Sequence, residues 1–245
     1  MGAIMLAGSG EFTTAMVAVD ERVLRQTPGA PARVAILPTA SGAEGQVPFD
    51  WIARGVSHFV ALGCNAVGVP ILGREEADDP AHVALLAGAD LIYLSGGNPG
   101  RLVEALRDTA AWRAIHAVWE RGGTIAGSSA GAMALAELTV APPAERGRGW
   151  LEAAWRPALG LVPGIGVLPH FDRLGAARSE PLIAAAPPDL TILGIDEDTV
   201  VLLVAGVATV LGAHTVSVHR AGQATVYRSG EAIDLALLAA LIAPR

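Results

Sequence analysis

Short apolar runs alternate with longer segments of helical periodicity over the first half of the chain. Most of the runs end at Gly, Ser or Thr, which are residues that favour turns. Strands that alternate with helices in this way predict a mainly parallel, doubly wound α/β sheet with flanking helices. The expected strands are 4–7, 33–38, 66–71, 90–94 and 124–126, and the expected helices are 13–26, 48–62, 80–87 and 101–120.

The pattern changes after Val140. Residues 141–149 are polar and contain Pro and Gly, so we expect a loop that either borders an active site or is a surface connection. The apolar run 200–213 predicts buried strands. Residues 215–227 predict a C-terminal β-hairpin, and residues 231–242 predict a last helix. Because no repeat or second composition is visible, residues 1–245 are expected to form a single α/β domain.

The composition narrows the classes of function. A hydrophobic fraction of 52% and 29 glycines suit a buried parallel sheet with tight turns. The net charge of −7 gives no electrostatic reason to expect nucleic acid as a partner. All 17 basic residues are arginine, which excludes a Walker lysine and a Schiff-base lysine. The single cysteine, Cys64, excludes an intramolecular disulfide and a cysteine metal cluster.

No segment of the sequence predicts export or membrane insertion. Residues 1–7 lack a basic region and lead into Gly8, so they are interpreted as a first strand and not as a signal peptide. The longest apolar run, 200–213, is shorter than the about 20 residues that a membrane helix needs. A cytoplasmic location without a membrane partner is therefore expected.

The segment G-S-S-A-G, from Gly127 to Gly131, carries the most specific chemical signal. The apolar residues 124–126 precede it, and the helix-forming residues 132–137 follow it. A strand, a sharp turn and a helix are the context of a nucleophile elbow, which projects a serine hydroxyl from the edge of a sheet. Ser129 is the central serine. An ordinary strand-to-helix turn is the alternative, since Gly and Ser also form such turns.

A nucleophilic serine needs a base, and the base needs an acid that orients it. His170 ends the apolar run 165–169 and begins a polar one, which places it where an α/β sheet presents side chains to a ligand crevice. The alternative is a histidine that is hydrogen-bonded locally at a strand end. The other histidines lie in helix-like segments or in the late strand region, and they are His58, His82, His116, His214 and His219.

The candidate acids are Asp196, Glu197 and Asp198, which lie between the apolar residues 190–192 and 200–204. Such clusters are often solvated turns, but apolar flanks of this strength favour at least one carboxylate near the core, where it needs a partner. The order along the chain is then serine, histidine, acid. This order differs from that of the α/β-hydrolases, in which the acid precedes the histidine.

Four segments in this order resemble peptidase family S51, the group of dipeptidase E and cyanophycinase. The segments are L-S-G-G-N at 94–98, G-S-S-A-G-A at 127–132, P-H-F at 169–171 and G-I-D-E-D-T at 194–199. They are specific as a set, although no one of them is specific by itself. The resemblance runs from the first strand to about Gly212. It implies a fold that is similar to the class I glutamine amidotransferases.

The resemblance also implies roles for individual residues. Ser129, which precedes Ala-Gly-Ala, would be the nucleophile, whereas Ser128 stands at the variable position. His170 would be the general base and then the general acid. Glu197 would be the orienting acid, with Asp196 as the second choice. The backbone N–H groups of Gly97 and Ala130 would form the oxyanion hole that a tetrahedral intermediate requires.

The chain departs from the cyanophycinase pattern at two places. Pro99 follows Asn98, where cyanophycinases have a glutamine that helps to hold substrate, and residues 172–178 are less basic than the corresponding cyanophycinase segment. The cyanophycin polymer is therefore a less favoured substrate. Asn98, Arg173 and Arg178 remain candidate substrate contacts, since a guanidinium binds a carboxylate bidentately. Two solvated loop arginines are the alternative interpretation.

Two glycine segments have alternative interpretations. Gly8-Ser9-Gly10 follows the first strand but lacks the third glycine of a dinucleotide fingerprint, so it is interpreted as a turn beside the catalytic crevice. Gly96 and Gly97 could bind phosphate, but they suit an oxyanion hole equally well.

The sequence therefore predicts a serine exopeptidase or dipeptidase that needs no metal or organic cofactor. Acidic N-terminal dipeptides or β-aspartyl linkages are the substrates that the resemblance implies. A homodimer is one assembly that it allows. The alternative is a non-hydrolytic protein that binds a small ligand on the same scaffold.

Overall fold

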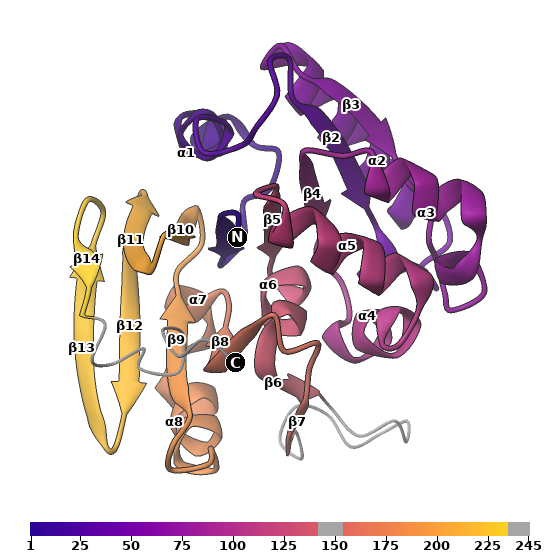
Figure 1. Ribbon diagram of the computed structural model, residues 1–245. Helices are drawn as coiled ribbons and strands as arrows, with labels where there is room; N and C mark the ends of the chain where they lie inside the picture. The colour runs from indigo at the N-terminus through magenta and orange to yellow at the C-terminus, as the bar shows by residue number, and fades with distance from the viewer. Residues whose placement is uncertain (142–153, 235–245) are drawn as a thin grey trace.

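Two β-sheets form the framework of the protein in the computed structural model, which describes residues 1–141 and 154–234 (Figure 1). The larger sheet has eight strands in the order β14-β11-β10-β1-β5-β4-β2-β3, and the smaller has six in the order β13-β12-β9-β8-β6-β7. A mixed α/β fold was predicted. The prediction of one sheet was wrong. After α6 ends at Leu135, the chain extends directly into β6, which pairs with β7 and β8 in a second sheet.

The larger sheet contains the predicted parallel strands. They are β1 (Ile4–Ala7), β5 (Thr124–Ser128), β4 (Leu91–Leu94), β2 (Arg33–Leu37) and β3 (Asn65–Gly68). Every residue of β1, β4 and β5 is buried, as expected for central strands covered on both faces. The antiparallel strands β10 (Thr199–Val204), β11 (Val207–Gly212) and β14 (Ala232–Ile233) extend the sheet beyond β1.

Helices cover both faces of the larger sheet (Figure 1). On one face, α1 (Val17–Leu24) and α2 (Val47–Ala61) pack on strand residues such as Met5 and Tyr93. On the other face, strand residues such as Leu6 and Leu94 share one core with another group of helices. These are α3 (Pro80–Ala87), α4 (Pro99–Leu106), α5 (Ala110–Glu120) and α6 (Ala130–Leu135). The core that contains Leu6 and Leu94 also includes residues of the smaller sheet, so the two sheets share hydrophobic packing.

The smaller sheet forms from the second half of the chain. Its strands are β6 (Ala136–Ala141), β7 (Ala154–Pro157), β8 (Val162–Leu168), β9 (Thr191–Ile195), β12 (Thr215–Arg220) and β13 (Gln223–Arg228). The strands β6, β8 and β9 are parallel. The helices α7 (Phe171–Leu174) and α8 (Ala176–Ala184) connect β8 to β9. The sheet therefore places the residues after β8 and β9 at neighbouring strand ends.

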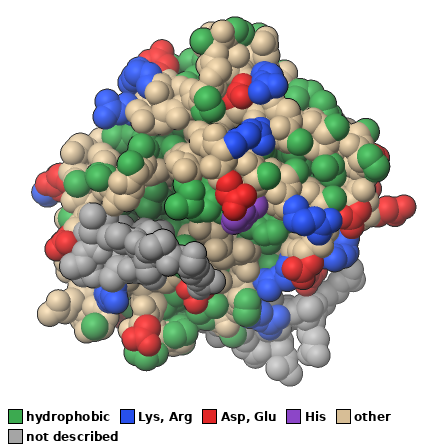
Figure 2. All heavy atoms as spheres, viewed as in Figure 1, with side chains coloured by type: hydrophobic (Ala, Val, Ile, Leu, Met, Phe, Trp, Pro, Cys, Tyr) green, Lys and Arg blue, Asp and Glu red, His purple; other side chains and the backbone are tan. Residues whose placement is uncertain are grey.

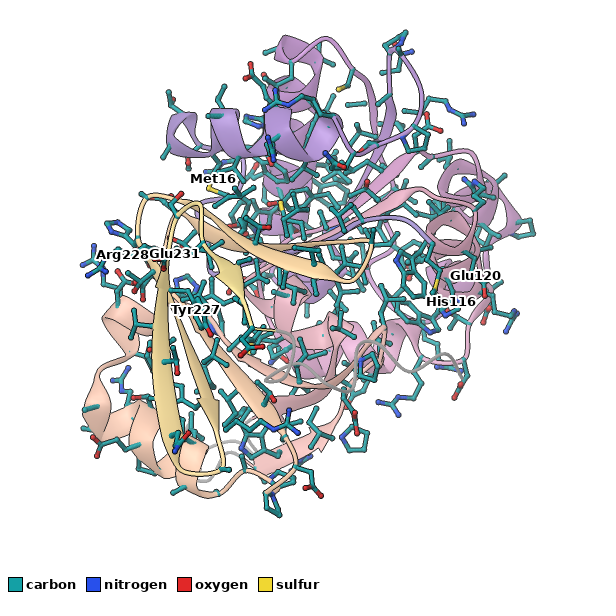
Figure 3. The ribbon with its side chains drawn as sticks, turned by 60° about the vertical axis from the view of Figure 1, so that its left-hand side comes forward. Met16, His116, Glu120, Tyr227, Arg228 and Glu231 are labelled. Atoms are coloured by element: carbon teal, nitrogen blue, oxygen red, sulfur yellow. The ribbon has the colours of Figure 1, made fainter. Side chains whose placement is uncertain are left out.

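The predicted long helix 101–120 is two helices, α4 and α5. α4 ends at Leu106, since the ψ of Arg107 is already 130°, and Asp108 follows in a left-handed conformation with a φ of +61°. Thr109 then begins α5, because its side chain accepts a hydrogen bond from the backbone N–H of Trp112. On α5, His116 Nδ1 lies 3.3 Å from Glu120 Oε1, one helical turn away (Figure 3).

The C-terminal strands pair in an antiparallel way. Ala221 and Gly222, with φ values of +49° and +77°, form the turn between β12 and β13. At the end of β13, the backbone N–H of Arg228 donates to Glu231 Oε2 at 2.7 Å (Figure 3). The predicted helix 231–242 was wrong at Ala232 and Ile233, which add β14 to β11, and residues 235–242 lie outside the described residues. Residues 142–149 of the predicted loop also lie outside them.

Arginine and acidic side chains are interspersed on the face of the molecule that Figure 2 shows. Among the described residues, no helix combines the length and the apolar character needed to cross a bilayer.

Candidate active site

The residues predicted to form a catalytic triad meet where the two sheets adjoin. Ser129 follows β5 of the larger sheet, and His170 follows β8 of the smaller sheet. Glu197 lies in the short turn where the chain leaves β9 of the smaller sheet and enters β10 of the larger one. The site therefore depends on the relative placement of both sheets and is not confined to the edge of one.

Ser129 has the strained backbone of a nucleophile elbow. Its φ of +50° and ψ of −112° are unfavourable for a residue with a Cβ atom. Its backbone N–H donates to the carbonyl of Ala7 at 3.0 Å, which fixes the turn to β1. A Cβ on Gly127 would lie 2.6 Å from the carbonyl carbon of Gly131, and a Cβ on Gly131 would lie 2.2 Å from the carbonyl oxygen of Leu94. Both glycines of the motif are therefore required by close backbone approach.

A chain of two hydrogen bonds connects the three side chains. Ser129 Oγ lies 3.0 Å from His170 Nε2, and His170 Nδ1 lies 2.8 Å from Glu197 Oε1. The carboxylate accepts the proton of Nδ1, which leaves Nε2 free to accept the serine proton. The His170 side chain is 42% exposed and that of Glu197 is 31% exposed, so a ligand has access from solvent. This arrangement can deliver a proton from the serine to the imidazole.

The structure separates Glu197 from Asp196, the second choice for the acid. Asp196 Oδ2 accepts hydrogen bonds from the backbone N–H and the hydroxyl of Thr215, at 3.0 and 2.7 Å, so it secures β12. The backbone N–H of Glu197 donates to Asp172 Oδ1 at 3.0 Å. Asp172 lies two residues after His170 and connects the segments that carry His170 and Glu197. Sequence reasoning missed this role of Asp172, although an acid so close to the histidine was a visible signal.

Phe171 fixes the segment that follows the histidine. Its ring packs on Gly194 of β9, where a Cβ atom would lie 2.6 Å from the ring, and its centroid lies 5.6 Å from that of His219. Burial lowers the pKa of His219, so that ring favours its neutral form. The backbone of His170 itself is left-handed, with φ +50° and ψ +39°. The packing of Phe171 therefore holds the neighbouring His170 in place, although the backbone of His170 is strained.

The predicted oxyanion donors, Gly97 and Ala130, lie on either side of Ser129. Among the described residues, neither the N–H of Gly97 nor that of Ala130 donates a hydrogen bond. Gly97 has a φ of +143°, and a Cβ there would lie 2.5 Å from the carbonyl oxygen of Ala40. Only glycine therefore suits this position. A Cβ on the preceding Gly96 would lie 3.5 Å from Ser129 Cβ, which places this loop against the serine.

The three candidate substrate contacts differ in their placement. Asn98 is exposed beside Gly97 and caps α4, because its Oδ1 accepts the N–H of Arg101 at 3.0 Å. Arg173 Nε lies 3.5 Å from Glu197 Oε2, and the Arg173 side chain is 74% exposed. Arg178 is exposed on α8. The structure thus brings Arg173 to the triad and Asn98 to the loop of Gly97.

Glu11 is a buried acid at the site that sequence reasoning missed. Its Oε1 accepts the backbone N–H of Gly96 at 3.1 Å, and its Oε2 accepts the hydroxyl of Ser128 at 2.7 Å. The turn that carries it was predicted to lie beside the crevice. It lies beside Ser129 and Gly97, since Glu11 contacts the residues that precede them, Ser128 and Gly96. The sequence signal was an acid that follows the Gly8-Ser9-Gly10 turn after the first strand.

Other histidines have partners of their own. His58 Nε2, on a side chain that is 8% exposed, lies 2.8 Å from Asp20 Oδ2, and His82 Nδ1 lies 3.1 Å from the carbonyl oxygen of Glu76. Burial raises the pKa of Asp20, and hydrogen bonding to His58 opposes this change. Within residues 1–141 and 154–234, no group of three or more His, Cys, Asp or Glu side chains is arranged to hold a metal ion.

Comparison with known sequences gives one family. Residues 4–211 match the sequence model of peptidase family S51. A cyanophycinase of Synechococcus elongatus is 30% identical over 230 residues, which cover 89% of this chain and 67% of that protein. A peptidase E of Citrobacter koseri is 29% identical over 171 residues, which cover 65% of this chain and 71% of that protein.

Solved structures show the same likeness. The crystal structure of a peptidase from an acI-B1 actinobacterium is similar with a TM-score of 0.83 and 28% identity, covering 95% of this chain and 96% of that one. A putative peptidase E protein from Listeria monocytogenes EGD-e shares the fold, with a TM-score of 0.56 and 18% identity over 93% of this chain and 98% of that one.

Proposed function

The chain belongs to peptidase family S51, and we propose that it hydrolyses small peptides as a serine peptidase through Ser129, His170 and Glu197. The observation that carries the proposal is the continuous hydrogen-bonded path from Ser129 Oγ through His170 to Glu197, which starts at a serine with strained backbone. Binding alone does not require such a path, whereas nucleophilic catalysis does.

In the proposed first step, Ser129 Oγ attacks the scissile carbonyl carbon while its proton moves to His170 Nε2. Glu197 holds the imidazole in the required tautomer and stabilises the charge of the imidazolium. The negative charge on the carbonyl oxygen is stabilised by the N–H groups of Gly97 and Ala130.

In the second step, the C–N bond breaks and His170 gives its proton to the leaving amine. The acyl group stays on Ser129 as an ester. Water then attacks the ester carbon while His170 takes a proton from the water. The acid product leaves, and the proton returns to Ser129 Oγ. The imidazole of His170 thus accepts or donates the proton in every step.

For the substrate, we propose peptides with an acidic N-terminal residue or a β-aspartyl linkage. The support is Arg173, whose exposed guanidinium lies beside the triad, next to Glu197 and Asp172. A substrate carboxylate would offer this guanidinium a further charged partner.

A peptide panel tests the substrate proposal. It contains Asp-X and Asn-X dipeptides, non-acidic dipeptides, N-terminally blocked Asp-X, and β-aspartyl-arginine. Wild type should prefer Asp-X or the β-aspartyl peptide. Arg173→Ala should reduce the ratio of kcat/KM for Asp-X to that for Asn-X, and Arg178→Ala provides the matched comparison. The ratio cancels any general effect of Arg173 on Glu197. An unchanged ratio in Arg173→Ala would show that Arg173 does not contact the acidic group.

The substitution Gly97→Ala should lower kcat/KM by about 10²–10³-fold, which is the usual effect of losing one oxyanion donor. The new Cβ would lie 2.5 Å from the carbonyl oxygen of Ala40, so the loop must move. The matched control is Gly122→Ala, where φ is also positive, at +101°, but no atom lies within 4 Å of the Cβ. Equal kinetics of the two variants would contradict a role for the Gly97 amide.

A further inference from the structure

Glu11 lies at the base of the site, although it is far from the catalytic residues in sequence. It follows β1 through a turn that contains Gly10, with a φ of +85°. Because β1 is parallel to β5 and pairs Ala7 with Ser128, the residues after the two strands lie next to each other. The next residue, Phe12, packs on Tyr93 with a centroid distance of 4.7 Å. The turn that carries Glu11 is therefore anchored in the core.

The carboxylate of Glu11 connects two segments that the proposed mechanism uses. Oε1 accepts the N–H of Gly96, which immediately precedes Gly97. Oε2 accepts the hydroxyl of Ser128, which immediately precedes Ser129. One side chain therefore joins the loop of one oxyanion donor to the elbow that supplies the nucleophile and the other donor.

The burial of Glu11 indicates a specific role. The residue is 8% exposed, and a buried carboxylate is costly unless hydrogen bonds compensate its desolvation. Its two hydrogen bonds are directed to backbone and side-chain groups of the site. The neighbouring Tyr93 is fully buried, and its pKa is raised by burial and by the negative charges of Asp20 and Glu11. None of these contacts of Glu11 is with a cationic side chain, and its carboxylate is held by the hydrogen bonds to Gly96 and Ser128.

The geometry does not suit Glu11 as the general base. Ser129 Oγ already pairs with His170 Nε2, whereas Glu11 bonds to the hydroxyl of Ser128. Yet a Cβ on Gly96 would lie 2.9 Å from Glu11 Oε1 and 3.5 Å from Ser129 Cβ, so the carboxylate lies against the backbone beside the nucleophile. Its direct contacts are with the residues that precede the reacting ones.

We propose that Glu11 is a positioning residue, which fixes the distance between the Gly97 loop and the Ser129 elbow and so sets the geometry of the oxyanion hole. The proposal rests on the proposed peptidase function. A small displacement of a catalytic group can lower the rate by about 10²-fold. Loss of Glu11 should therefore act on the transition state more than on substrate binding.

The test compares Glu11→Ala and Glu11→Gln in the full chain. Glu11→Ala should lower kcat by about 10²-fold with little change in KM. Glu11→Gln should restore most of the activity, because the amide oxygen can accept from Gly96 and the amide N–H can donate to Ser128 Oγ. Ser128→Ala removes only one of the two bonds and should give an intermediate loss. This variant keeps the test valid if Glu11→Ala fails to fold.

The matched control is Asp20→Asn, which alters another buried acid that bonds to His58 and not to the site. It should affect thermal stability but not the kcat of the folded enzyme. Unchanged kcat in folded Glu11→Ala would overturn the proposal. A rise in KM alone would overturn it as well, since that result indicates a substrate contact. Glu11→Gln as inactive as Glu11→Ala would overturn it by showing that the charge is required.

A second readout separates this proposal from the proposed function. The rate at which a fluorophosphonate labels the nucleophile depends on the oxyanion hole but needs no peptide substrate. Slower labelling of Glu11→Ala than of Glu11→Gln supports the positioning role even if wild type cleaves no peptide of the panel. Equal labelling rates in folded variants contradict it, even if wild type is an active peptidase that requires Ser129.

Discussion

Ser129→Ala should lose nearly all peptide hydrolysis, with kcat reduced by about 10⁶-fold, as is usual when a serine nucleophile is removed. Ser129 Oγ is the atom that lies 3.0 Å from His170 Nε2, and the methyl group of alanine cannot attack a carbonyl. Affinity for an unreacted peptide should change only slightly, because the substitution removes one oxygen atom. The measurement is single-turnover hydrolysis together with binding of the same peptide by calorimetry.

The matched control is Ser179→Ala. Ser179 is a buried serine on α8 whose hydroxyl donates to the carbonyl of Gly175 at 3.1 Å. Its loss should affect stability and leave kcat unchanged. Substantial hydrolysis by Ser129→Ala would contradict the assignment of Ser129 as the nucleophile. Binding of peptides by both wild type and Ser129→Ala, with hydrolysis by neither, would instead favour a protein that only binds its ligand.

Glu197→Gln should lower kcat by about 10⁴-fold with a much smaller change in KM, by analogy with loss of the orienting acid in other serine peptidases. An amide that donates its N–H to His170 Nδ1 would place the imidazole proton on Nε2. That nitrogen could then no longer accept the proton of Ser129. The serine would stay in place, 3.0 Å from the ring, but without a base.

The neighbouring Asp196→Asn is the control for this substitution. Asp196 Oδ2 accepts two hydrogen bonds from Thr215, so the change should lower the unfolding free energy while kcat of the folded protein is retained. Kinetics measured on folded fractions of both variants decide between the two acids. A large loss of kcat in Asp196→Asn with a mild effect of Glu197→Gln would show that Asp196, and not Glu197, is the orienting acid.

The parallel half of the fold could be predicted because its signals are local. The apolar runs in β1, β4 and β5 and the turns after them are short, and each of these strands is buried throughout. The second sheet could not be predicted in this way. A strand such as β8 has the same pattern whichever sheet it joins, and its partners are set by contacts between distant segments. The break at Asp108 and Thr109 did carry a local signal, the helix cap of α5.

The residues of the candidate site also divide into those with a local sequence signal and those placed by contacts between distant segments. Ser129, His170 and Glu197 were selected because each lies in a recognisable segment at a strand end, and the structure brings them together. Adjacency in sequence could not separate Glu197 from Asp196, since the difference lies in which way each side chain leaves the turn. Glu11 was missed because its two hydrogen bonds span 85 and 117 residues of sequence.

Covalent labelling of Ser129 tests the central claim most directly. Wild type is treated with a fluorophosphonate, digested and analysed by mass spectrometry that resolves Ser128 from Ser129. We expect one phosphonyl group per chain, attached to Ser129 Oγ, and very slow labelling in His170→Ala because the base is absent. An adduct on Ser128 or on another residue, or a labelling rate in His170→Ala equal to that of wild type, would contradict a nucleophilic Ser129 activated by His170.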